Sequence, residues 1–192
     1  MRRLLLALAL LAVAVAGWYA LAGGREVVDR ARYPIRYAGI VRTHAHNYRL
    51  DPALLAAVIA VESRFRPHVR SRAGAIGLMQ LLPDTAKGIA ARTGGSKFSV
   101  ADLDTPEINV RYGSWYLRHL LDRYQGRPNT VELALAAYNA GSGNVDRWVA
   151  ASPGSVSVSI PSAFAETRAY VDRVRAYEKI YRKLYAHQLG IA

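Results

Sequence analysis

The chain has 192 residues, of which 52% are hydrophobic, and 26 Lys and Arg against 14 Asp and Glu give it a net charge of +12. This is enough for one domain with its own core, and the absence of cysteine excludes a disulfide framework, a thiolate metal site and a thiol nucleophile. The charge favours an anionic partner: nucleic acid, a membrane surface or an acidic cell-wall polymer.

The first 24 residues have the pattern of an export segment. Arg2 and Arg3 precede an uncharged run over residues 4–24, which suits either a secretory signal peptide or an N-terminal membrane anchor. Residues 20–22, Ala-Leu-Ala, resemble a cleavage site, whereas the length of the run favours retention. Both interpretations place the rest of the chain outside the cytoplasm, so we expect a membrane contact through this segment and no nucleic-acid partner.

A polar connector is expected over residues 25–36, and a first helix from Tyr37 to Tyr48. His44 and His46 lie on that helix two positions apart, and residues with this spacing do not face one site. We therefore interpret His44 as a core or groove residue and predict no metal site.

Asp51 and Pro52 predict the start of the next helix, because Asp is a favoured N-cap and proline is favoured at the first helical position. The run that follows is mostly Ala, Leu, Val and Ile. Pro67 is expected to close this helix.

Glu62 stands on the apolar face of that helix. Leu55, Val58 and Ile59 precede it by seven, four and three residues and share its face. A carboxylate there is either a buried structural group paired with Arg or an acid whose pKa is raised for proton donation. Its neighbour Ser63 either orients the carboxyl group or hydrogen-bonds the preceding helical turn.

The remainder of the chain also reads as helices. The only strand-like pattern is a brief alternation over residues 155–160, inside a Ser/Gly/Pro-rich connector at 151–162. The fold class is therefore all-α. The expected elements are a loop through Gly74 and Gly77, a helix from near Pro83, a helix from Thr105-Pro106 to about Tyr124, a helix capped by Thr130 and ended by Gly141, a short helix through Val145 and Trp148, and a last helix from Phe164 to His187 with a core-packing tyrosine stripe.

Two hydrolytic chemistries lack support in the pattern. No Ser lies in a strand-turn-helix elbow, and no His pair has the four-residue spacing of a helical zinc site. Glycosidic cleavage remains, because its essential step is protonation of a leaving oxygen by a carboxylic acid of raised pKa.

Four segments resemble a known family. "ESRFRPHVRSRAGAIGLMQLLPDTA", "TPEINVRYGSWYLRHLL", "ALAAYNAGSGNVDRW" and "ETRAYVDRV" are similar, in order, to the motifs of the soluble lytic transglycosylase catalytic domain, which has a goose-lysozyme-like fold. The resemblance runs from about Tyr37 to Tyr181. It implies an all-α, lysozyme-like helical domain with a glycan-binding cleft over residues 37–187, preceded by an N-terminal hydrophobic helix.

The resemblance also implies site residues and a reaction. Glu62 is the catalytic acid, and the chain needs no cofactor and no metal. The expected partner is the peptidoglycan glycan strand in the extracytoplasmic envelope of a bacterium, where cleavage leaves a 1,6-anhydro end on N-acetylmuramic acid. A lysozyme-type hydrolase and a non-catalytic wall-binding module are the alternatives. The implied substrate-binding residues are Ser71, Gly77, Met79, Gln80, Tyr138, Asn139, Glu166 and Tyr170.

The chain departs from the family pattern in two places. An aromatic residue usually follows the Ile-Pro before Glu-Thr-Arg, whereas here Phe164 comes two residues later. The segment after Glu62 is also unusually basic and is expected to form a solvated face suited to an anionic wall; its cations are Arg64, Arg66, Arg70 and Arg72.

Overall fold

The computed structural model of the chain describes residues 1–21, 23–151 and 160–191. These form two compact units, Met1–Ile35 and Arg36–Ala192. The connector expected at 151–162 and the alternation at 155–160 fall almost wholly outside the described residues.

The first unit contains two helices, α1 (Arg2–Leu21) and α2 (Gly24–Arg32). The stretch Arg2–Ala20 has a mean hydropathy of 1.9 and, among the described residues, is the one candidate for a membrane-spanning helix. A secretory signal has the same length and composition. The segment expected as a connector is thus largely helical, and an ion pair between Arg30 and Glu26, four residues apart, supports α2.

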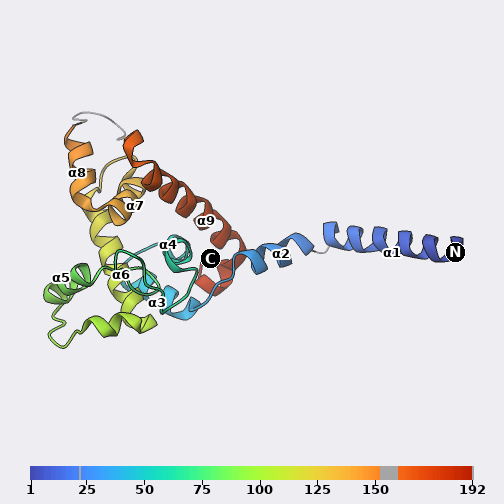
Figure 1. Ribbon diagram of the computed structural model, residues 1–192, viewed down its shortest axis with the longest axis horizontal. Helices are drawn as coiled ribbons and strands as arrows, with labels where there is room; N and C mark the ends of the chain where they lie inside the picture. Colours follow the sequence, from blue (N-terminus) through green and yellow to red (C-terminus); the bar gives the residue numbers. More distant parts are fainter. Residues whose placement is uncertain (22, 152–159, 192) are drawn as a thin grey trace. The chain divides into compact units, whose positions relative to one another are not determined.

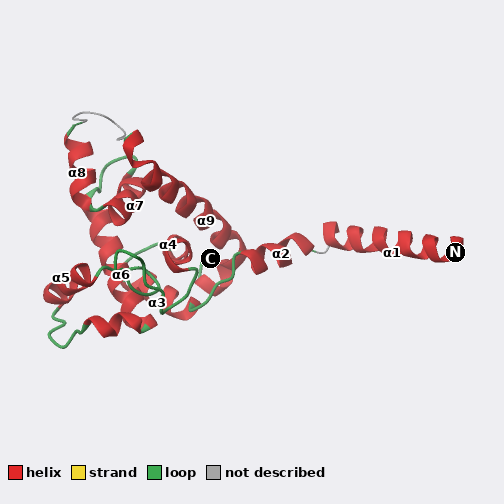
Figure 2. Cartoon of the chain, in the orientation of Figure 1, coloured by secondary structure: helices red, strands yellow, loops and turns green. Residues whose placement is uncertain are grey.

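The second unit is built of helices and loops (Figures 1 and 2). In the part of the chain that is described, extended pairing is limited to isolated bridges that join Ile76 to Arg70 and to Leu81, so the all-α prediction is confirmed. The elements are α3 (Ala38–Asn47), α4 (Pro52–Ser63), α5 (Pro83–Thr93), the 3₁₀ helix η1 (Val100–Asp104), α6 (Pro106–Arg123), α7 (Thr130–Ala140), α8 (Ser142–Ala150), the 3₁₀ helix η2 (Ser162–Phe164) and α9 (Ala165–Leu189).

The start of α4 is held by one carboxylate with two tasks. Oδ1 of Asp51 accepts hydrogen bonds from the backbone N–H groups of Ala53 at 2.8 Å and Leu54 at 3.3 Å, as the N-cap prediction requires. Its other oxygen pairs with Arg182 on α9. The cap therefore also ties the beginning of α4 to the far part of α9.

The end of α4 comes earlier than predicted. The helix stops at Ser63, because Arg64 and Phe65 adopt left-handed backbone angles with φ of 53° and 57°. Pro67 lies beyond this break and does not cause it. Phe65 turns into the core, where its ring meets Tyr181 edge-on with centroids 6.0 Å apart.

The core is arranged around α4. Every residue from Ala53 to Ala60 is buried, which is typical of a helix covered on all sides. α9 and α3 pack against it, and α9 buries Tyr181 and Tyr185 of the predicted stripe. Glu62 in the last turn of α4 is thereby held against a rigid, apolar framework.

His44 occupies a core position, as predicted. The residue is 3% exposed, and its Nε2 lies 2.6 Å from Oε1 of Glu107 at the start of α6. The pair joins α3 to α6. His46 is exposed and takes no part in this contact.

The predicted cap of α7 is wrong by one residue. Thr130 is the first helical residue and Asn129 precedes it. The Thr130 hydroxyl lies 2.8 Å from the carbonyl of Tyr124 and 2.6 Å from that of Arg127. It therefore fastens the α6–α7 turn instead of capping the helix.

Candidate active site

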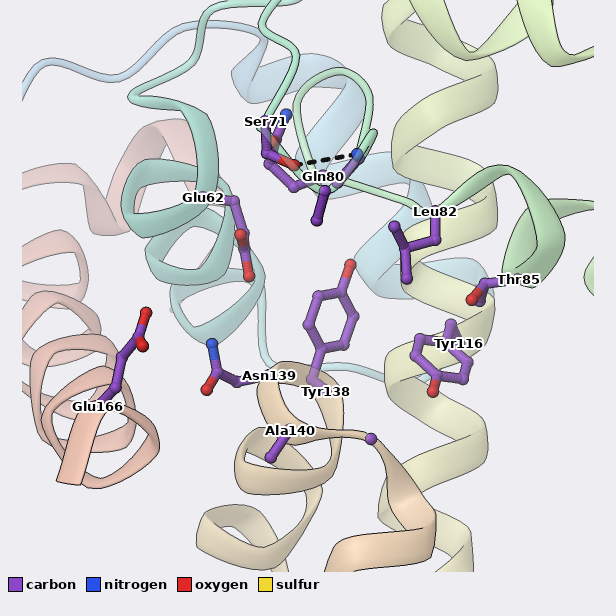
Figure 3. A pocket seen from close by; sticks show the side chains of 13 residues that line it. Glu62, Ser71, Gln80, Leu82, Thr85, Tyr116, Tyr138, Asn139, Ala140 and Glu166 are labelled. Carbon is purple, nitrogen blue, oxygen red and sulfur yellow. Dashed lines mark hydrogen bonds between the residues drawn. The ribbon is translucent and has the colours of Figure 1, made fainter. Parts of the chain in front are cut away.

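A pocket of about 530 Å³ opens beside the last turn of α4 (Figure 3). Six of the nine predicted site residues line it: Glu62, Ser71, Gln80, Tyr138, Asn139 and Glu166. They come from α4, the loop after it, the end of α7 and the start of α9. The lining residues that the sequence did not single out are Ala73, Ala75, Leu82, Thr85, Tyr116, Ala140 and Gly141.

Glu62 has the properties of a proton donor at neutral pH. Burial disfavours its charged form and raises its pKa from 4.5 to about 7, against the opposing effect of a hydrogen bond from Tyr170. That bond joins the Tyr170 hydroxyl to Oε1 of Glu62 at 2.7 Å, and Tyr170 itself is buried on α9. No Arg or Lys of the described residues contributes to this shift, which removes the interpretation of Glu62 as one half of a buried ion pair.

Tyr138 forms a wall of the pocket. Its hydroxyl points toward the loop that carries Gln80 (Figure 3) and donates a hydrogen bond to the carbonyl of Met79 at 2.8 Å. Its ring lies 5.4 Å from that of Tyr116. Burial, and secondly the nearby charge of Glu62, raises the pKa of Tyr138 well above its ordinary value, so the phenol stays neutral.

Gln80 and Ser71 stand on the loop between α4 and α5. Gln80 has a left-handed φ of 48°, and its amide nitrogen donates to the carbonyls of Val69 at 3.0 Å and Gly77 at 2.9 Å. Its donors are thus used within the loop, and its carbonyl oxygen is the polar atom left for a ligand. The Ser71 hydroxyl accepts a hydrogen bond from the N–H of Ala75 at 3.0 Å.

Gly77 and Met79 belong to the same loop but are absent from the pocket lining. Met79 is fully buried, and its sulfur packs so closely on α6 that a Cβ at Gly113 would come within 2.2 Å of it. Gly77 has φ of 81°, and a Cβ there would lie 2.1 Å from the Asn109 amide nitrogen. These residues shape the loop, and Met79 presents its carbonyl to Tyr138.

Asn109 on α6 is the structural residue that the sequence analysis missed. Its side chain is 1% exposed, accepts from the N–H of Met79 at 2.8 Å and donates to the carbonyls of Ile76 and Leu103, both at 2.9 Å. One amide therefore satisfies three buried backbone groups of the site loop and η1. The available signal was a polar residue on the same helical face as Gly113.

Asn139 on α7 and Glu166 on α9 complete the lining of the pocket. Glu166 is exposed in the first turn of α9, while the Asn139 side chain points toward Glu62 (Figure 3). The aromatic residue displaced in the sequence, Phe164, packs edge-on against Trp148 of α8 with centroids 4.6 Å apart and is not among the lining residues.

The residues next to Glu62 in sequence have separate tasks. The Ser63 hydroxyl donates to the carbonyl of Ile59 at 3.1 Å, so it bonds the preceding helical turn. All four arginines of the basic segment are exposed. Arg70 among them is paired with Asp104 at 2.7 Å.

Over the described ranges, no three or more His, Cys, Asp or Glu side chains gather to hold a metal ion.

Comparison with known proteins identifies relatives of the chain. The family model "Transglycosylase SLT domain" matches residues 39–156. The soluble lytic murein transglycosylase of Salmonella typhimurium is 35% identical over 162 residues, which cover 79% of this chain and 24% of that protein. The chain thus spans about a quarter of the length of that relative.

Two solved structures are also similar. An inactive mutant of the lytic transglycosylase Slt from Pseudomonas aeruginosa superimposes with a TM-score of 0.72 at 32% identity, over 84% of this chain and 26% of that one. The 70 kDa soluble lytic transglycosylase from Escherichia coli gives a TM-score of 0.71 at 28% identity, over 85% and 26% of the two chains.

Proposed function

Because the chain belongs to the transglycosylase SLT family, we propose that it is a peptidoglycan lytic transglycosylase with Glu62 as its catalytic group. The bond cleaved is the β-1,4 linkage from N-acetylmuramic acid to N-acetylglucosamine. The relatives are named as lytic murein transglycosylases, and they supply the substrate class. The single observation that carries the proposal for this chain is the half-buried Glu62 carboxyl, whose pKa of about 7 suits it to give and take a proton at neutral pH.

Glu62 acts twice in the proposed reaction. Its carboxylic acid protonates the glycosidic oxygen, the bond from that oxygen to C1 of the muramoyl sugar breaks, and N-acetylglucosamine leaves with the proton. The acetamido group of the muramoyl sugar stabilises the cationic C1. The Glu62 carboxylate then removes the proton of the same sugar's 6-hydroxyl, whose oxygen bonds to C1 and closes the 1,6-anhydro ring. Glu62 is protonated again at the end.

Residues in and around the pocket hold Glu62 and the sugar in place in this proposal. Tyr170 holds one Glu62 oxygen through its hydrogen bond, and the Gln80 carbonyl oxygen is free to accept the N–H of an acetamido group. Tyr138 offers a neutral ring surface for a pyranose. An intramolecular hydroxyl has a large effective concentration, which favours ring closure over attack by water.

The test is product analysis with the full-length chain in detergent. Digestion of purified peptidoglycan should release disaccharide peptides that are one water lighter than hydrolysis products and resist borohydride reduction. Glu62→Gln should fold and lose cleavage by a factor of about 10² to 10⁴ or more, because a glutamine has no acidic proton to give. Cleavage by a folded Glu62→Gln chain at the wild-type rate would remove Glu62 from the mechanism.

The alternatives give different products. A lysozyme-type hydrolase would release reducible ends, and Glu166, which lines the pocket, is then the candidate base for water. A wall-binding module would release nothing from any preparation while still sedimenting with the wall.

We also propose that residues 1–24 keep the protein on a membrane, with the catalytic unit in the bacterial envelope. The apolar stretch Arg2–Ala20 supports this, because a helix of about 20 apolar residues spans a bilayer. Membrane fractionation with N-terminal sequencing is the test. A mature chain that begins near Gly23 and partitions into the soluble envelope fraction would identify a cleaved signal peptide.

A further inference from the structure

Three hollows adjoin one another along α6, outside the Glu62 pocket. Their volumes are about 330, 260 and 580 Å³. The first two share Arg111 and Tyr112 among their lining residues, and the second and third share Tyr48. None of their lining residues belongs to the Glu62 pocket. We call these three hollows together the α6 groove.

Each of the three hollows is lined in part by residues of α6, the helix labelled in Figure 1. The α6 residues of the groove extend from Ile108 to Asp122 along one side of the helix, over about 21 Å at 1.5 Å per residue. This stripe of α6 consists of Ile108, Arg111, Tyr112, Trp115, Arg118, Leu121 and Asp122, and Gln125 lines the groove just after the helix ends.

The α6 groove has an excess of positive charge that the protein does not neutralise. Arg49, Lys97 and Arg111 line it with exposed side chains. No described acid lies in salt-bridge contact with any of these three cations. Two acids also line the groove: Asp122 is paired with Arg118 at 2.7 Å, and Asp102 accepts a hydrogen bond from the Ser99 N–H at 2.8 Å. The groove therefore attracts an anion along its length.

Aromatic side chains accompany these cations. Tyr48 and Trp115 line the middle hollow and are half-buried, and Phe98 lines the first one. The Arg111 guanidinium lies 5.3 Å above the Tyr112 ring. Half-buried rings offer flat apolar surface with a polar edge, which suits the faces of sugar rings, whereas unpaired guanidinium and ammonium groups suit carboxylates.

We propose that the α6 groove binds a second peptidoglycan strand, with its sugars against the aromatic rings and its stem-peptide carboxylates on Arg111, Lys97 and Arg49. This inference rests on the proposed function, because peptidoglycan is the polymer that the Glu62 pocket would meet. The length of the stripe accommodates several consecutive sugars, and the wall is a network in which strands lie close together. Binding there would hold the enzyme on the wall while the pocket cleaves a neighbouring strand.

The test uses the full-length Glu62→Gln chain, which binds without cutting. Its affinity for purified sacculi is measured by co-sedimentation, with and without the groove changes Lys97→Glu and Arg111→Glu. The matched control carries Lys179→Glu and Lys183→Glu, two exposed positions on α9 outside the groove. The groove variant should bind at least tenfold more weakly, and the control should change less than twofold. An equal loss of affinity in the groove variant and in the control would show that only the net charge of the protein matters, and would overturn the proposal.

A second measurement separates this site from the catalytic pocket. In the active chain, the groove variant should cleave a short soluble peptidoglycan fragment at the parental rate but release less product from whole sacculi. A parallel loss on the fragment would show that the changes act through the fold or the pocket, and would overturn the proposal. If neither chain cleaves the fragment, the proposed function fails while the co-sedimentation result still decides whether the groove binds peptidoglycan.

Discussion

The hydroxyl of Tyr170 donates a hydrogen bond to Oε1 of Glu62 at 2.7 Å, across 108 positions in the sequence. The two residues belong to α9 and α4, which pack against each other in the core. The bond stabilises the carboxylate form and so opposes the effect of burial on the pKa of Glu62. The acid is thereby kept near neutrality, where both of its protonation states are accessible.

We expect Tyr170→Phe to move the pH profile of cleavage toward alkali. Loss of the hydroxyl removes a group that lowers the Glu62 pKa, so the acid form persists above pH 7 and the alkaline limb shifts upward. The maximal rate should fall by about tenfold, because the carboxylate is then a less well-oriented base. Rates on a soluble fragment between pH 5 and 9 measure both effects. An unchanged alkaline limb would show that this hydrogen bond does not tune Glu62.

The stability of the protein should respond to pH through Glu62. Its pKa is raised in the folded chain from 4.5 to about 7, which means that the fold favours the protonated form of Glu62. Its contribution to the stability of the fold is therefore fully present below about pH 4.5 and is lost as the pH rises through 7. Glu62→Gln removes this dependence. The free energy of unfolding of the variant minus that of wild type should therefore be roughly 1 to 3 kcal/mol larger at pH 8 than at pH 4.

Urea unfolding of both chains at the two pH values measures this gain. Other titrating groups are common to the two chains and cancel in the comparison. A difference between the chains that is the same at pH 4 and pH 8 would contradict a raised Glu62 pKa.

Asn109→Ala should strongly destabilise the protein and the loop that carries Gln80. The Met79 N–H and the Leu103 carbonyl lose their side-chain partner, whereas the Ile76 carbonyl keeps the hydrogen bond from the Leu81 N–H. Each group left unsatisfied costs about 1 to 3 kcal/mol. Ser114→Ala is the matched control, because Ser114 is equally buried on α6 but its hydroxyl has no hydrogen-bond partner among the described residues. Thermal denaturation should show a large loss for Asn109→Ala and none for Ser114→Ala. Equal melting temperatures would refute the bracing role of Asn109.

Gly77→Ala and Gly74→Ala should differ although both glycines have φ near 80°. At Gly74 an added Cβ meets nothing within 4 Å, so the cost is the backbone strain of about 1 kcal/mol. At Gly77 it would collide with the Asn109 amide and with the Leu103 carbonyl at 2.6 Å. Gly77→Ala should therefore lower the melting temperature more than Gly74→Ala does, and should also lower the cleavage rate severalfold more. Thermal denaturation and product release measure the two effects.

The comparison of Glu62 with Asn109 shows what local sequence reveals. Both are polar residues on an apolar helical face, and the pattern around Glu62 predicted a buried acid. In the structure Glu62 is half-buried at the pocket, and its burial raises its pKa. Asn109 gives a weaker signal, because its partners are backbone groups that lie up to 33 positions away in the sequence. A hydrogen bond to a backbone group leaves no trace in the identity of the partner residue.

The α4–α5 loop marks another limit of prediction. A motif places Met79 and Gln80 side by side, but only the folded chain shows that Met79 turns into the core and Gln80 reaches the pocket. The end of α4 was missed for a similar reason. Arg64 adopts a left-handed conformation that usually belongs to glycine. The residue type at this position therefore did not indicate that the helix ends there.

The internal hydrogen bonds of Gln80 and Tyr138 have a consequence for inhibitors. The N–H groups of Gln80 and the O–H of Tyr138 donate to loop carbonyls. The polar atoms that these two side chains leave for a ligand are therefore oxygens with lone pairs. A small molecule that presents ammonium, amide N–H or hydroxyl groups there finds acceptors, whereas one that presents only carbonyl or ether oxygens meets repulsion. Libraries directed at this pocket are therefore best weighted toward donor-rich, cationic sugar mimics.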